Sequence, residues 1–198
     1  MNTINLFNAQ LNSDGEVGDL YRGLGFSFDT MSTDKYFIKK YQHESGNSLS
    51  SDIPLMRAAD LHLLFAEALN RMGDTTVAMI VLNDGMKNTK RPKPNPQYTN
   101  WNKNLGIRGR VGLWNVEIPP MDDASKILFI EDRILDERAM ELAFEGRRWF
   151  DLMRIARRRN DPSYLANRVA SKFSDPAKAD NIRSLLSNPQ NWYLPKDY

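Results

Sequence analysis

A row of glutamates at helical spacing limits how this chain can fold more than any other feature. Glu137, Glu141 and Glu145 follow one another at intervals of four, so on a helix they lie near one face. Three carboxylates in one row repel each other unless cations neutralise them, so we expect arginines from this helix or another segment to bind them. Arginine suits this role because its planar guanidinium can bind a carboxylate through two hydrogen bonds.

The residues around the row predict a kinked helix over 125–160. Asp122, Asp123 or Ser125 can cap its start. Gly146 should kink or interrupt the helix, and the Asp161-Pro162 pair should end it. An apolar stripe with helical spacing accompanies the charges, formed by Ile127, Ile130, Ile134, Leu135, Ala139 and Leu142.

The charged residues of this helix have two interpretations, a paired-carboxylate active site and a structural salt-bridge network. We favour the network, because ion pairs perturb carboxylates as readily as catalysis does. Arg138, Arg148 and Arg154 each lie three residues from an acidic residue. The expected network contains Arg133, Glu137, Arg138, Glu141, Glu145, Arg148, Asp151 and Arg154.

Nothing else in the sequence completes an acid–base site. The two histidines, His43 and His62, fall in a predicted loop and a different helix. The sequence contains no phosphate-binding loop, dinucleotide glycine motif, HExxH motif or nucleophile elbow. We therefore expect no catalytic residue, no cofactor and no metal site.

The rest of the chain predicts a mainly α fold with a tetratricopeptide-like helix pair, long loops and little β-structure. Residues 1–51 should be irregular with short strands at 25–29 and 35–41, and residues 52–87 should form the helix pair. Leu61 and Phe65 belong to the expected buried face of its first helix. A long loop, 88–124, precedes the kinked helix, and 161–198 form a tail, within a single partial domain spanning 1–198.

Composition excludes several classes of function. The net charge of +2 over 198 residues does not favour nucleic-acid binding. The absence of cysteine excludes disulfides and thiolate chemistry. No run of about 18 apolar residues is present to form a membrane span.

The segments described so far resemble the C-terminal part of SusD/RagB-type proteins. The resemblance is carried by ERAMELAFEGRRWFDLMR at 137–154 and ADLHLLFAEALNR at 59–71, with weaker support from 34–41, 51–57 and 193–195. It covers about 34–160 well and the ends poorly.

The resemblance implies a non-catalytic lipoprotein at the cell surface, in the outer membrane. Such a protein would bind a glycan, oligosaccharide or other nutrient and deliver it to a TonB-dependent, SusC-like transporter. The lipoprotein signal and anchor cysteine of this family are not in the chain, so the resemblance also implies a fragment. A helical protein–protein interaction scaffold without a small-molecule ligand is the alternative.

Candidate ligand contacts follow from local chemistry, because sugars stack on exposed aromatic rings and hydrogen-bond to amides. The long loop carries Tyr98, Asn100 and Trp101 in one short run, and Trp114 follows. These four residues are the expected ligand-binding set. Alternatively, the aromatic residues anchor the loop to the core.

Overall fold

The computed structural model describes residues 3–12, 14–32, 35–42, 54–85 and 106–193. These residues form eight α-helices and one two-stranded sheet, so the mainly α fold expected from the sequence is confirmed. Within this part of the chain no helix has both the length and the apolar composition needed to cross a membrane. The elements, in chain order, are α1 (Thr3–Asn8), β1 (Phe28–Ser32), β2 (Lys35–Ile38), α2 (Ala58–Arg71), α3 (Thr75–Asp84), α4 (Gly106–Arg110), α5 (Asp123–Glu141), α6 (Arg148–Arg158), α7 (Pro162–Ala170), α8 (Pro176–Leu186) and the short 3₁₀ helix η4 (Pro189–Trp192).

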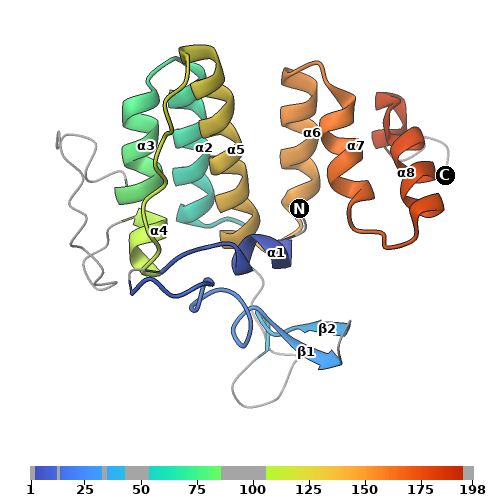
Figure 1. Cartoon of the computed structure of the whole chain (residues 1–198), viewed down its shortest axis with the longest axis horizontal. Helices are drawn as coiled ribbons and strands as arrows, with labels where there is room; N and C mark the ends of the chain where they lie inside the picture. The colour runs from blue at the N-terminus through green and yellow to red at the C-terminus, as the bar shows by residue number, and fades with distance from the viewer. Residues whose placement is uncertain (1–2, 13, 33–34, 43–53, 86–105, 194–198) are drawn as a thin grey trace.

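The helices form two groups (Figure 1): α2, α3 and α5 lie side by side, and α6, α7 and α8 follow one another in the second group. The antiparallel β1–β2 hairpin lies at the end of the molecule near α1. Phe28 on β1 fixes it there by packing against Phe7 of α1 and Phe144, with ring centroids 5.8 and 6.2 Å away.

The helix pair predicted over 52–87 is present as α2 and α3, but α2 begins at Ala58. Arg57 precedes it with an extended backbone, and its guanidinium binds Glu141 and Glu145. These contacts explain why the helix does not start earlier. Gly73, at a φ of 86°, makes the turn between the helices, and the Asp74 carboxylate caps α3 by accepting from Val77 N–H at 3.1 Å.

The buried face of α2 differs from the predicted one at Leu61 and Phe65, although Ala59 and Leu69 of the predicted face do pack against the core. Leu61 and Phe65 are 54% and 39% exposed, whereas Leu63 and Ala66 are fully buried against α3 and α5. The helix carries apolar residues on both faces, so periodicity alone cannot identify the face that packs. The outer face consists of exposed apolar residues at Ala58, Leu61, Phe65, Ala68 and Met72.

The predicted kinked helix over 125–160 is two helices, α5 and α6, separated by residues 142–147. Phe144 and Gly146 have φ angles of 65° and 73° in this connection. Left-handed residues end an α-helix, so the glycine interrupts the helix completely. Glu145 consequently lies beyond the end of α5.

The predicted long loop and tail both contain helices. Of 88–124, the structure describes 106–124, which begin with α4, continue through the non-helical residues 111–122 and end in the first residues of α5. The tail contains α7 and α8, each with a proline in its first turn and an aspartate cap, Asp161 or Asp175. Capped starts of this kind stabilise short helices.

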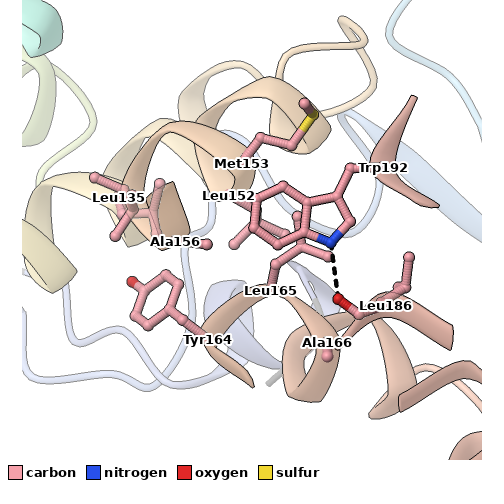
Figure 2. Packing of buried hydrophobic residues seen from close by; sticks show 10 residues of the cluster. Leu135, Leu152, Met153, Ala156, Tyr164, Leu165, Ala166, Leu186 and Trp192 are labelled. Carbon is pink, nitrogen blue, oxygen red and sulfur yellow. Dashed lines mark hydrogen bonds between the residues drawn. The ribbon is translucent and has the colours of Figure 1, made fainter. Parts of the chain in front are cut away.

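Trp192 closes the hydrophobic core formed by α6, α7 and α8. Its ring packs among Leu152, Leu165 and Leu186, and the indole Nε1–H donates to the Leu186 carbonyl at 2.7 Å (Figure 2). Trp192 is only 4% exposed. The end of the described chain is therefore part of the fold.

Replacing Trp192 with alanine should lower the free energy of unfolding by about 3–5 kcal/mol, because a large cavity replaces the ring. Urea denaturation followed by circular dichroism measures the change. Leu185→Ala is the matched control, since this neighbour is 51% exposed and should change stability by about 0.5 kcal/mol or less. Equal losses in both variants would contradict the packing described.

Candidate functional site

Glu137 lies at the centre of a buried ion-pair cluster. Its side chain is fully buried, and its two carboxylate oxygens each accept from one guanidinium: Arg22 Nη1 at 2.7 Å and Arg108 Nη1 at 2.6 Å. Burial alone would raise the pKa of Glu137, but the positive charges of Arg22 and Arg108 outweigh it and lower the pKa. Glu137 is therefore ionised and fully engaged.

Glu141, one turn further along α5, has three arginine partners. Oε1 accepts from Arg110 at 2.9 Å and from Arg57 at 3.0 Å, and Oε2 accepts from Arg22 at 3.0 Å. Burial again favours the neutral acid, but Arg22 and Arg110 lower the pKa below its ordinary value. One arginine, Arg22, thus neutralises two neighbouring glutamates of the same helix.

Glu145 joins the cluster from the connection after α5. Its carboxylate lies 2.7 Å from Lys40 Nζ and 2.8 Å from Arg57 Nη2. Lys40 also donates to the backbone carbonyls of Glu141 and Ala143, at 3.0 and 3.1 Å. These contacts use carbonyl groups at the C-terminus of α5, where positive charge is favourable.

A second series of ion pairs joins α2 to α5 and α6. Arg138 lies between Asp60 and Asp151, at 2.7 and 2.9 Å. Arg154 binds the other oxygen of Asp151 at 2.9 Å and makes a two-bond contact with Glu67 on α2, at 3.1 and 2.7 Å. The two helix groups are therefore connected through charged side chains as well as apolar packing.

Three members of the predicted network have other partners. Arg133 forms its ion pair with Asp136, at 2.9 Å, and Arg148 donates to the Leu135 carbonyl at 2.9 Å. Arg138 contacts Asp60 and Asp151 rather than Glu141, because it lies on the side of α5 that faces α2 and α6. Within the described ranges, no group of three or more His, Cys, Asp or Glu side chains is arranged to hold a metal ion.

Several cations of the cluster were not predicted from the sequence: Arg22, Lys40, Arg57, Arg108 and Arg110. All five lie outside α5, and Arg22 is separated from Glu137 by 115 positions. The repulsion within the glutamate row predicted that cations would be present. The repulsion did not indicate which arginines or lysines would supply the positive charges.

Trp114 connects this cluster to the surface. Arg108, while bound to Glu137, also donates to the Trp114 carbonyl from Nε at 3.0 Å and from Nη2 at 2.7 Å. The Trp114 N–H donates to the Leu11 carbonyl at 3.0 Å. The residue itself is 55% exposed, so a fixed backbone presents an accessible indole. The other three predicted ligand contacts, Tyr98, Asn100 and Trp101, lie outside the described residues.

A groove of about 500 Å³ runs between α3 and the non-helical segment 118–121, and sequence reasoning did not predict it. Asp84 lines it at the end of α3. Burial raises the pKa of Asp84 to about 6, although a hydrogen bond with Asn115 opposes the shift. No pattern in the sequence marks this acid, because its hydrogen-bond partner, Asn115, lies 31 positions further along the chain.

The fold and the ion pairs define a class of protein: a mainly helical molecule with an antiparallel helix pair and buried glutamates neutralised by arginine. The chain belongs to the SusD family, whose model matches residues 19–196. Members of this family are generally non-catalytic outer-membrane accessory proteins that bind carbohydrates or other nutrients.

A comparison with curated proteins supports the same family. Over 120 residues the chain is 35% identical to the SusD-like protein P38 of Formosa agariphila. The match covers 59% of this chain and 20% of that protein, so it spans about a fifth of the relative's length. No solved structure matches the chain.

Glu137→Gln should destabilise the protein by about 3–5 kcal/mol, because it leaves two buried guanidinium groups without a countercharge. Asp180→Asn is the control, since this exposed carboxylate pairs with Arg183 at the surface and its loss should cost about 1 kcal/mol or less. Urea denaturation at neutral pH compares the two. A Glu137→Gln variant as stable as the Asp180→Asn variant would show that the central ion pairs do not support the fold.

Asp84 should make a pH-dependent contribution to stability. Its pKa is raised to about 6 in the folded protein, so the folded state favours the protonated acid. The stability associated with Asp84 should therefore be present at low pH and lost as pH rises through about 6. Relative to the unsubstituted protein, the Asp84→Asn variant should therefore become more stable as pH rises from about 4 to about 7. Urea titrations across this range test it, and a constant difference would contradict the raised pKa.

Proposed function

We propose that this chain is part of a non-catalytic nutrient-binding protein at the cell surface, held at the outer membrane by a lipid anchor. Its ligand would be a glycan, oligosaccharide or other nutrient, and its partner a TonB-dependent, SusC-like transporter that receives the ligand. The family membership supports this assignment.

The observation that carries the ligand-binding part of the proposal is the accessible indole of Trp114 on a fixed backbone. An aromatic ring of this kind offers its face to the apolar face of a sugar ring. Because Arg108 and Leu11 hold the backbone of Trp114, little conformational entropy would be lost on stacking. Tyr98, Asn100 and Trp101 complete the proposed set, with the asparagine amide bonding sugar hydroxyl groups.

We also propose that the protein catalyses no reaction, because its buried glutamates are already bound by arginines. A general acid or base must have a free proton position near the reacting group. Glu137 and Glu141 instead accept from arginines at both oxygens, and their pKa values are lowered. This arrangement suits carboxylates that hold segments together.

A helical protein-binding scaffold is the second candidate, and one observation favours it. The outer face of α2 presents Leu61, Phe65 and Met72 to solvent, at 54%, 39% and 82% exposure. Exposed apolar residues in one row are typical of surfaces that contact another protein. The transporter would be one such partner.

Trp114→Ala should weaken oligosaccharide binding by about two- to tenfold, which corresponds to a stacking contribution of about 0.5–1.5 kcal/mol. A glycan array identifies a bound oligosaccharide, and isothermal titration calorimetry then compares the variants. Phe150→Ala is the control, because Phe150 is also an exposed aromatic residue, 64% accessible, but lies on α6, away from the segment that carries Trp114.

The comparison separates the two candidate functions. Weaker binding by Trp114→Ala alone supports the proposed site. Equal binding by Trp114→Ala and the unsubstituted protein would remove Trp114 from it. A chain that binds no glycan on the array but forms a complex with another protein, lost on Phe65→Asp substitution, would favour the scaffold.

A further inference from the structure

A polar cavity of about 410 Å³ lies where α1, α5, α6 and α7 meet. Neither Trp114 nor a glutamate of the cluster lines it, although Gln10 in its lining accepts a hydrogen bond from Arg108 of the cluster at 3.2 Å. Three guanidinium groups line it, those of Arg133, Arg148 and Arg168, together with one carboxylate, Asp136, and the amide side chain of Asn167. Its lining therefore carries more positive than negative charge.

The three arginines differ in how far other groups neutralise them. Arg133 pairs with Asp136 at 2.9 Å. Arg168 stacks 3.5 Å above the ring of Tyr164 and lies 3.7 Å from Asp132, a carboxylate that Arg159 contacts more closely, at 2.9 Å.

Arg148 is the least neutralised of the three. Throughout the described ranges, no carboxylate lies within ion-pair distance of Arg148, and its one hydrogen bond is that from Nη1 to the Leu135 carbonyl. The other N–H groups of its guanidinium remain available in the lining of the cavity.

The electrostatics of the cavity favour an incoming anion. Burial lowers the pKa of the Arg148 guanidinium, and the nearby charge of Arg168 adds to this effect, against the opposing influence of Asp136. A partly buried cation without a close ion-pair partner raises the free energy of the folded state. An anion in the cavity would remove this penalty and gain charge-assisted hydrogen bonds.

We propose that this cavity binds an oxyanion, a carboxylate or sulfate group. Arg148 would be the main residue that binds the anion, and Arg168 would be the supporting cation. The guanidinium of Arg148 can offer two parallel N–H groups to two oxygens of the anion. Asn167 is placed to assist: its Oδ1 accepts from Arg183 Nε at 3.0 Å, which leaves its amide N–H groups as donors. The site does not depend on glycan binding at Trp114.

The probes are galacturonate and inorganic sulfate, with galactose and sodium chloride as the neutral and ionic-strength controls. Isothermal titration calorimetry and thermal unfolding at constant ionic strength should show binding of one or both anions and none of galactose. Response to galacturonate alone would assign a carboxylate site, and response to both would assign a general oxyanion site. No response beyond that to chloride would overturn the proposal.

Arg148→Met keeps an unbranched stem of similar shape and removes the charge, so it should weaken anion binding at least tenfold. Arg157→Met is the matched control, because Arg157 lies on the same helix and stacks on Tyr193 outside the cavity. Unchanged affinity in Arg148→Met would overturn the assignment. Should that variant fail to fold by circular dichroism, Asn167→Asp supplies a second test: this position is exposed, and a carboxylate there should repel the anion and lower the affinity.

Discussion

The burial of Glu137 between Arg22 and Arg108 is the interaction on which the arrangement of this protein depends. An isolated carboxylate in an apolar interior is unfavourable by several kcal/mol, and only close cations with good geometry offset that penalty. Both oxygens of Glu137 have such a partner, at 2.7 and 2.6 Å. Because the two arginines come from the segment before β1 and from α4, satisfying one side chain positions two otherwise irregular parts of the chain against α5.

The cluster explains how segments with little apolar content of their own become ordered. Residues 14–27 have few core residues, yet Arg22 is 8% exposed and joins Asp19, Glu137 and Glu141. Arg57 acts similarly at the start of α2. Replacing such a cluster with apolar residues can leave stability unchanged or increase it, so its distinctive contribution is specificity. Each guanidinium satisfies its partners only in one placement of its segment.

The sequence predicted the helical class, the helix pair and the family, all of which are confirmed. These features depend on local periodicity and on motifs that lie within single helices. The partners of the glutamates depend on contacts such as that between Arg22 and Glu137, 115 positions apart, and no local pattern encodes them. The same reasoning failed on α2, where Leu61 and Phe65 repeat as regularly as the residues that pack. Of the predicted ligand contacts, only Trp114 lies among the described residues. The spacing of residues along the chain did not indicate that Arg108 would hydrogen-bond to the Trp114 carbonyl.

The state of each arginine distinguishes structural positions from candidate binding positions. Arg22, Arg108 and Arg138 each contact two or more carboxylates or backbone carbonyls and are nearly inaccessible, at 9%, 7% and 3% side-chain exposure. A ligand could reach them only by displacing those partners. Arg148 has a single carbonyl contact and lines an open cavity. The same helical segment, 131–154, thus contains cations that close carboxylates neutralise and one, Arg148, with no carboxylate within ion-pair distance among the described residues. This difference is why the proposed anion site centres on Arg148.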